Sequence, residues 1–558
     1  MDIKDILRTA FTQALHAACA QGKINLPEGA VLPEVFLEVP PRKELGDFAT
    51  NLAMQSSKVF RTNPRVIAQA IVDTFSCPQV DRLEIAGAGF INVFLVKSMP
   101  YQILSGMLAK GSEFGQLPKK EQPRIQIEFV SANPTGKLHV GHGRGAAFGG
   151  SLANLMLAAG YNVQKEFYIN DAGNQIDNLA KSVEARYLEL LGVACEFPED
   201  GYHGQDIIDT AKKIIAEFGD KYLHVQQAER LNELKEYALA EKLQGLKDDL
   251  AEFDVTFDNW FSERSLYQAD KINAACEQLA KQGYLYEQDG AKWLKSTAFG
   301  DDKDRVVIRD NGIPTYLAAD IAYHQNKLER GFDKLINIWG ADHHGYIARV
   351  RAAIQGLGYS GDCLEVLILQ MVSLYRDGQL VKMSKRTGQS ITLTELIEEV
   401  GKDAARYFFV MRSIDSQLDF DLNLAIEKSA DNPVYYVQYA HARICSILRQ
   451  MQELNIADDI TLDIDTLSTL TMEAELDLIK KLSSYEEELE YAATERAPHR
   501  IAHFVYELAS LFHTFYNQCR IVGVEPDLQR ARISLVRLVK TNIVHALNLL
   551  GVSAPERM

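Results

Sequence analysis

The sequence predicts an α/β chain in which a split parallel-sheet domain with a helical insertion lies between an N-terminal α+β domain and a C-terminal all-α helix bundle. Three observations support this prediction. Apolar strand-like runs alternate with helical patterns between about residues 120 and 400, as in βαβ units. A strongly charged helical stretch interrupts these runs at about 175–300. From about residue 431 onward, the periodicity is helical throughout.

We therefore expect four segments in chain order. A chain of 558 residues has room for three or so domains, each with an ample core. The expected bounds are 1–110 for the N-terminal domain, 120–400 for the parallel-sheet domain, 401–430 for a connecting stem and 431–558 for the helix bundle.

The composition is that of an ordinary soluble protein, with 47% hydrophobic and 24% charged residues. A net charge of −17 argues against indiscriminate nucleic-acid binding but leaves room for a local basic face. The seven cysteines are far apart and form no Cys-x-x-Cys pair, so we expect no zinc site and a cytoplasmic protein with reduced thiols. No signal-peptide pattern or uncharged membrane-length stretch is present, so we expect no membrane partner.

The N-terminal domain shows helix and strand signals in turn. Apolar side chains from Ile3 to Phe11 have helical spacing, and Asn63-Pro64 predicts an N-cap followed by proline at the first helical position. The apolar runs Val35–Val39 and Phe90–Leu95 predict strands.

The sheet domain begins with a strand, a turn and a helix. Ile125–Val130 alternates as a strand does, the loop through Asn133 and Gly136 breaks it, and a small-residue helix is expected to open near Gly143. A helix N-terminus offers unpaired N–H groups and partial positive charge to phosphate. The motif His139-Val-Gly141-His142 lies where this helix starts, and a glycine there lets a ligand approach closely.

The second half of the sheet domain carries further polar residues. Tyr316 and Asp320 are four residues apart, so they share one face of a helix. The predicted strand Leu335–Trp339 runs into Asp342, His343 and His344, at the carboxyl edge where ligands bind in open α/β sheets. Two histidines and an aspartate could suggest a metal, but no further ligand is spaced to complete such a site.

A basic stretch follows a predicted hairpin at Arg376–Gln379. Lys382 and Lys385 flank Met383 and Ser384, with Arg386 beside them. Such point charges suit a triphosphate, whose negative charge shifts during nucleotidyl transfer. A solvated basic loop is the ordinary interpretation of this stretch by itself, and only its pairing with the histidine motif makes the catalytic interpretation stronger.

Together these motifs resemble those of class I aminoacyl-tRNA synthetases, whose His-Ile-Gly-His and Lys-Met-Ser-Lys-Ser signatures match His139–His142 and Lys382–Arg386. The closer resemblance is to the arginyl-tRNA synthetase family and covers the whole chain. The stretches that carry it are Glu128–Pro134, Tyr316–Tyr323, Tyr436–Arg443 and the terminal Pro555–Met558. The resemblance implies a split Rossmann-type catalytic domain, with tRNA-binding domains at both ends.

The resemblance also implies particular site residues. The guanidinium pocket would use Glu128, Tyr316 and Asp320, with Ser131 and Asn133 near the α-amino and carboxylate groups. Which of Asp342, His343 and His344 contacts the substrate stays open. His139, His142, Lys382 and Lys385 would be catalytic, and ATP would bind at Gly136, His139, Gly141, His142, Met383, Ser384 and Lys385.

The implied reaction is the ATP-dependent, AMP-forming ligation of L-arginine to the terminal 2′-hydroxyl of tRNA(Arg), with Mg²⁺ bound to ATP and no resident metal. We expect a monomer. Tyr435, Tyr439 and Arg443 could stack on anticodon bases, although aromatic residues at helical spacing are more often core residues.

Three other functions are compatible with parts of the pattern. Another class I synthetase is disfavoured by the carboxylates and by the lack of a zinc-type cysteine set. A smaller nucleotidyltransferase would not need the helical C-terminal domain. A catalytically inactive tRNA-binding paralogue is disfavoured by the intact histidines, lysines and Glu128.

Overall fold

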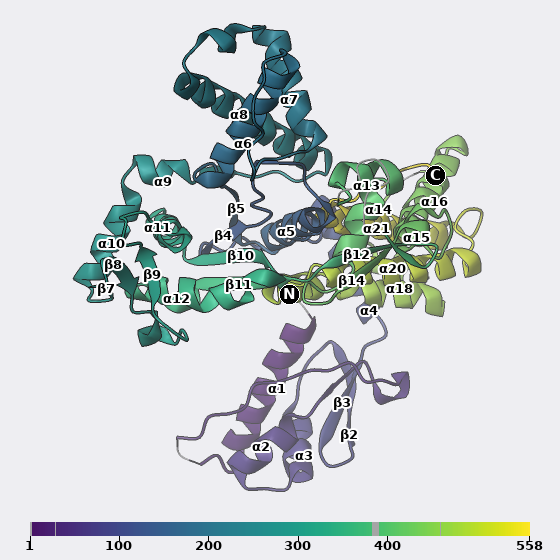
Figure 1. Cartoon of the computed structure of the whole chain (residues 1–558). Helices are drawn as coiled ribbons and strands as arrows, with labels where there is room; N and C mark the ends of the chain where they lie inside the picture. Colours follow the sequence, from purple (N-terminus) through teal and green to yellow (C-terminus); the bar gives the residue numbers. More distant parts are fainter. Residues whose placement is uncertain (1–2, 28, 382–389, 458) are drawn as a thin grey trace. The chain divides into compact units, whose positions relative to one another are not determined.

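A five-stranded parallel sheet with strand order β11-β10-β4-β5-β6 lies in the larger of the two units into which the chain divides (Figure 1). The computed structural model describes residues 3–27, 29–381, 390–457 and 459–558. The larger unit comprises residues 110–459, 480–523 and 533–558. The strands of the sheet are β4 (Arg124–Glu128), β5 (Asn162–Ile169), β6 (Asn259–Ser262), β10 (Lys334–Gly340) and β11 (Leu364–Leu369).

The sheet joins two distant parts of the chain. β4 pairs in parallel with β5 on one side and with β10 on the other, so Glu128 lies opposite both Glu166 and Asn337. The carboxyl ends of β4 and β10 therefore lie together, although some 200 residues separate them in sequence. The predicted split parallel sheet is confirmed.

The stretch between the two halves is not wholly helical. It begins with α6 (Asn174–Leu190), α7 (Gln205–Phe218) and α8 (Gln227–Glu252), which share a buried core. β6 then adds an edge strand to the main sheet, and three further strands form a small antiparallel sheet. These strands have four residues each, too short for a clear alternating pattern. Two helices, α9 and α10, lie in the same stretch of the chain. The bounds of the three strands and two helices are β7 Leu285–Gln288, β8 Ala291–Leu294, β9 Arg305–Ile308, α9 Arg264–Gln268 and α10 Lys271–Lys281.

Helix α5 (Val140–Ala158) is buried along almost its whole length. Its small residues permit this, because they let neighbouring elements approach closely. At Gly149 a Cβ atom would overlap the side chain of Phe129, the residue that follows β4. The helix begins at Val140, three residues earlier than expected near Gly143.

The rest of the larger unit holds helices and a second small sheet. A three-stranded sheet in the order β13-β12-β14 precedes the helical C-terminal part in the chain. The elements are α11 Tyr316–Glu329, α12 Ile347–Gly356, β12 Val372–Arg376, β13 Gln379–Val381, α13 Leu393–Val400, α14 Lys402–Val410, β14 Leu418–Asp421, α15 Leu422–Ile426, α16 Pro433–Glu453, α19 Tyr485–Thr494 and α20 His499–Gln518.

The helix α21 (Pro526–Leu550) is long and apolar enough to cross a membrane by length and composition, and no other helix among the described residues is. Within its most apolar window, 67% is buried inside the protein, which is typical of a core helix. The helix carries charged residues, among them Arg537 and Lys540, so it is not an uncharged stretch.

The smaller unit comprises residues 1–109 with segments 460–479 and 524–532. Its antiparallel sheet, in the order β1-β3-β2, packs with helices around a core that includes Phe11, Ile71 and Val93. The elements wholly or mainly in this unit are α1 Ile3–Ala20, β1 Phe48–Thr50, α2 Leu52–Phe60, α3 Pro64–Thr74, β2 Val80–Ala86, β3 Phe90–Leu95, α4 Met99–Lys110, α17 Ile464–Leu467 and α18 Glu473–Ser483.

One predicted strand of the smaller unit is wrong. Val35–Val39 makes only an isolated bridge, between Glu38 and Ala49. Prolines at positions 33, 40 and 41 flank the run, and proline has no N–H to donate to a ladder. The N-cap predicted at Asn63 is confirmed, because its side chain accepts the N–H of Arg65.

We expect Gly149→Ala to lower the unfolding temperature, because the added methyl must displace Phe129 at the end of β4. Overpacking of this kind costs about 1–3 kcal/mol. Gly245→Ala on α8 is the matched control, since a Cβ there meets nothing within 4 Å and alanine favours a helix. Thermal unfolding of both variants checks this, and equal midpoints would contradict it.

Candidate active site

The two histidines of the first motif cap helix α5. His139 is the N-cap residue, and its Nδ1 accepts the backbone N–H groups of Gly141 and His142 at 3.1 and 3.4 Å. Nδ1 of His142 in turn accepts the N–H of His139 at 3.3 Å. The two rings stack with their centroids 3.7 Å apart. A Cβ at position 141 would lie 3.0 Å from the His139 ring, which explains the glycine.

The geometry sets the charge and tautomer of both imidazoles. Burial lowers the pKa of His139, and burial together with His139 lowers the pKa of His142 to about 4. Both rings are therefore neutral at pH 7. Because each Nδ1 accepts a hydrogen bond, each Nε2 carries the proton. The pair thus offers two N–H donors at a helix N-terminus, where an anion is favoured.

The chain that follows the lysine motif is bonded to the histidine motif. Val140 donates its N–H to the carbonyl of Ile391, and Leu393 donates to that of Leu138. His139 and Thr392 form a β-bridge, and Thr392 caps α13 in a capping box with Glu395. The predicted catalytic and ATP-binding residues Lys382, Met383, Ser384 and Lys385 lie outside the described residues.

The backbone after β4 is strained at the point where it leaves the sheet. Val130 and Ser131 have φ of +68° and +42°, a region that non-glycine residues rarely adopt, least of all β-branched ones. Ser131 Oγ donates to Glu128 at 3.0 Å and accepts the N–H of Tyr168 at 3.2 Å. The turn therefore holds Ser131 over the end of the sheet. Asn133 and Gly136 lie further along the same loop.

Asp320 is the centre of an acidic cluster. Its pKa is raised to about 7, chiefly by burial and further by Glu128 and Glu263, whereas the Tyr346 hydroxyl, which donates to Oδ2 at 2.5 Å, opposes the rise. Burial also raises the pKa of Glu263, which accepts a hydrogen bond from the Tyr267 hydroxyl at 3.4 Å. Three carboxyl groups from three separate elements thus act on one another beside the carboxyl ends of β4 and β10.

The other predicted arginine-binding residues are more exposed. Tyr316 lies one helical turn before Asp320 on α11 and is 66% exposed. Asp342 and His343 are exposed and pair with each other at 3.0 Å. From this loop it is Tyr346 that reaches Asp320. No group of three or more His, Cys, Asp or Glu arranged to hold a metal occurs in the described ranges.

A buried lysine accompanies Glu128. Lys327 Nζ donates to Glu128 Oε2 at 2.6 Å and to Asn337 Oδ1 at 3.1 Å, and its side chain is fully buried. Sequence reasoning missed Lys327, Glu263 and Tyr346. For Lys327 a signal existed, because Lys327 is seven residues after Asp320 on one helix face and Glu128 is a charge in an apolar strand that needs a buried partner.

The predicted tRNA-binding residues form a column on α16. The Tyr435 and Tyr439 rings lie parallel with centroids 6.2 Å apart. Arg443 donates to the Tyr439 hydroxyl at 2.8 Å and lies between that ring and Tyr516, 4.6 and 4.5 Å from their centroids. Tyr439 and Tyr516 are 39% and 40% exposed, so their rings are accessible rather than core residues.

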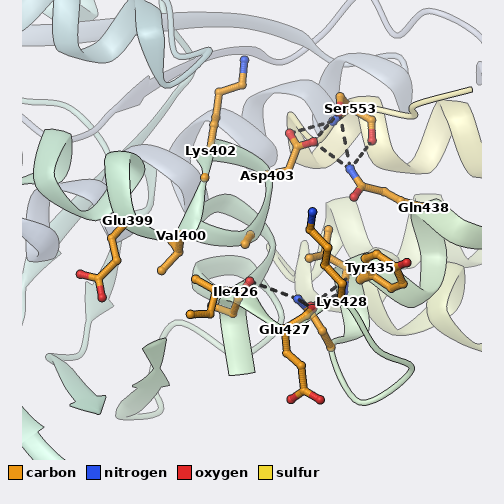
Figure 2. A pocket seen from close by; sticks show the side chains of 15 residues that line it. Glu399, Val400, Lys402, Asp403, Ile426, Glu427, Lys428, Tyr435, Gln438 and Ser553 are labelled. Atoms are coloured by element: carbon orange, nitrogen blue, oxygen red, sulfur yellow. Dashed lines mark hydrogen bonds between the residues drawn. The ribbon is translucent and has the colours of Figure 1, made fainter. Parts of the chain in front are cut away.

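A pocket of about 580 Å³ borders this column (Figure 2). Tyr435 lines it, together with Lys428 and residues of α14. Figure 2 shows Asp403 hydrogen-bonded to Gln438 and Ser553, which ties the C-terminal tail to α16. The pocket therefore has one aromatic wall and a nearby ammonium group.

Models of known families match three successive parts of the chain. The N-terminal domain model of arginyl tRNA synthetase matches residues 5–95. The catalytic-domain model of class I (R) tRNA synthetases matches residues 103–444, and that of the DALR anticodon binding domain matches residues 437–558.

Individual proteins are similar over the same length. The arginine–tRNA ligase of Carboxydothermus hydrogenoformans is 54% identical over 523 residues, 94% of each chain, and that of Bacillus subtilis is 49% identical over the full length of both. A solved structure of a putative arginyl-tRNA synthetase from Campylobacter jejuni has a TM-score of 0.76 at 37% identity, covering 83% of this chain and 100% of that one. Thermus thermophilus arginyl-tRNA synthetase, at 23% identity and a TM-score of 0.75 over 99% of this chain and 100% of that one, shares the fold.

The histidine-capped helix, the split parallel sheet and these full-length similarities agree with one another, and the chain belongs to the arginyl-tRNA synthetase family.

Proposed function

We propose that the Asp320 cluster binds the guanidinium of arginine and that the stacked histidines bind ATP, in the ligation of arginine to tRNA that this family carries out. The observation that carries this proposal is Asp320, a half-buried carboxyl whose only hydrogen bond from the described residues is donated by Tyr346. Two further carboxyl groups lie close enough to raise its pKa. Such a site favours a cation strongly, since binding one relieves the repulsion.

A guanidinium suits this site better than an ammonium does. It is planar, permanently charged and rich in N–H donors, so it can bond a carboxylate and a neighbouring oxygen together. Tyr316, one turn from Asp320, would cover it. Ser131 and Asn133, on the turn after β4, would contact the α-amino and carboxylate groups, together with Asp342 or His343.

ATP would bind where the histidines cap α5. The Nε2–H groups of His139 and His142 would donate to phosphate oxygens, and the backbone at Gly136 and Gly141 would approach the nucleotide closely. Lys382 and Lys385, with Met383 and Ser384 between them, would complete the site. Mg²⁺ would arrive bound to the triphosphate.

The reaction then proceeds in two transfers. The carboxylate of arginine attacks the α-phosphorus of ATP, forming arginyl-adenylate and releasing pyrophosphate. The terminal 2′-hydroxyl of tRNA next attacks the activated carbonyl and releases AMP. Neutral imidazole donors, already oriented by the cap, would stabilise the added phosphate charge without reorganisation.

Transfer RNA would be held by both ends of the chain. The column of Tyr435, Tyr439 and Arg443 offers stacking faces to bases, and the matching anticodon-domain model supports this role. We propose domain bounds of 1–110, 120–400, 401–430 and 431–558. We further propose that the protein acts as a cytoplasmic monomer without a membrane partner.

The proposed activity is tested by pyrophosphate exchange with each amino acid, with and without tRNA. Exchange should occur with arginine in the presence of tRNA. Exchange driven by a different amino acid, or none with arginine plus tRNA, would reject the proposal.

Asp320→Asn should raise the KM for arginine by roughly 10- to 150-fold, the equivalent of about 1.5–3 kcal/mol for a charge-assisted hydrogen bond. The KM for ATP should stay nearly unchanged. Equal increases in both would show that Asp320 has a structural role only.

The same residue should give arginine use a pH dependence. The guanidinium binds the ionised carboxylate, and the pKa of Asp320 is raised to about 7, so below pH 7 binding must displace a proton. The KM for arginine should therefore fall as pH rises from 6 to 8. In Asp320→Asn this step should disappear, and its persistence would assign it to another group.

Tyr439→Ala should raise the KM for tRNA by roughly 5- to 150-fold, because stacking on an aromatic ring contributes about 1–3 kcal/mol per base. The KM for arginine should not change. Tyr439→Phe is the matched control, since it keeps the ring and loses only the hydroxyl bonded to Arg443. A Tyr439→Ala enzyme with an unaltered KM for tRNA would exclude this residue from the contact.

A further inference from the structure

Lys327 places a buried ammonium group next to the acidic cluster. Lys327 lies on α11, seven residues after Asp320, and its side chain has no exposed surface. Its ammonium lies 4.3 Å from the Tyr323 ring centroid, in addition to its bonds to Glu128 and Asn337. Burying such a group is costly, so its persistence beside the substrate site calls for a reason.

Hydrogen bonds continue from Lys327 to the backbone of Asp320. Asn337, which accepts from Lys327, donates through Nδ2 to His324 Nε2 at 2.9 Å. Nδ1 of His324 donates to the Asp320 carbonyl at 2.8 Å. Burial and Lys327 lower the pKa of His324 to about 3, so the ring is neutral and its tautomer follows from these partners.

On the other side the same network reaches the strained turn. Glu128 accepts from Lys327 through Oε2 and from Ser131 through Oε1, so both of its oxygens have partners. Ser131 in turn accepts the N–H of Tyr168 on β5. A continuous chain of bonds thus runs from β5 through Glu128 and Lys327 to the helical turn that carries Asp320.

The network also fixes the charge of the site. The groups that face one another there are the carboxyls of Glu128, Asp320 and Glu263, the hydroxyls of Tyr168 and Tyr346, and the ammonium of Lys327. Three carboxyls so close together cannot all stay ionised without a cation. Lys327 neutralises one of them from inside the protein, which leaves the other two for a ligand that enters from outside.

We propose that Lys327 is a positioning residue for arginine recognition, because it neutralises Glu128 and holds the turn that presents Asp320 to the substrate. This inference rests on the proposed assignment of Asp320 to guanidinium binding, which Asp320→Asn tests separately. Lys327 does not touch the substrate. Its role is to let Asp320 ionise, so that the Asp320 carboxylate can bind the guanidinium of arginine.

The test is Lys327→Met in the full-length enzyme, with arginine and ATP each varied in tRNA aminoacylation. Without the ammonium, nothing offsets the negative charge of Glu128, so ionising Asp320 beside it becomes harder. The KM for arginine should rise at least tenfold at pH 7, and the KM for ATP should change by less than twofold.

Arg330→Met is the matched control. Arg330 caps the same helix and bonds another buried carboxylate, Glu166, at 2.5 Å and 2.9 Å. It should lower the unfolding temperature and leave the KM for arginine within threefold of the wild-type value. Similar increases in the two variants, or an unchanged KM for arginine in Lys327→Met, would overturn the proposal.

A double variant, Lys327→Met with Glu128→Gln, separates charge from packing. Once Glu128 is neutral, loss of the lysine should raise the KM for arginine by less than threefold relative to Glu128→Gln alone. If loss of the lysine raises the KM for arginine just as much in the Glu128→Gln variant, the proposal that Lys327 acts by neutralising Glu128 is overturned. Should Lys327→Met fail to fold, folding of the double variant supports the proposal, and failure of both refutes it.

Discussion

The parallel pairing of β4 with β10 is the contact on which the site depends. It aligns Glu128 with Asn337 although the two residues are separated by the whole insertion. Parallel strands point their carboxyl ends to the same edge, so the turn after β4 and the loop after β10 meet there. The turn after β4 leads to the histidines that cap α5, and the loop after β10 carries Tyr346. Without this pairing, the acidic cluster and the imidazoles would belong to separate parts of the chain.

Burial gives the two halves of the site opposite electrostatic character. At the start of α5 it removes charge from His139 and His142, so that they act as neutral donors beside the positive end of a helix dipole. Around Asp320 it raises the pKa of Asp320 to about 7 and also raises the pKa of Glu263. One half therefore suits phosphate oxygens, and the other suits a cation. The same physical effect, loss of water, would thus prepare the two proposed sites, one for the phosphates of ATP and one for the guanidinium of arginine.

Much of this could be predicted from local pattern. The N-cap at Asn63, the strands β4 and β10, and the common face of Tyr316 and Asp320 follow from short-range rules and are confirmed. The run Val35–Val39 fails because flanking prolines oppose a ladder that its apolar side chains favour. The short strands β6, β7 and β8 were missed because four residues carry too little periodicity.

The sequence by itself determined the order of the main segments, the motif that caps α5 and the family to which the chain belongs, since each depends on neighbouring residues or on whole motifs. Only the tertiary structure decided that Lys327 pairs with Glu128, that Tyr346 rather than the adjoining histidines reaches Asp320, and that Asp320 titrates near neutrality. These depend on which distant groups share a buried space. Electrostatic interactions strengthen when water is removed, and no local pattern states where that removal occurs.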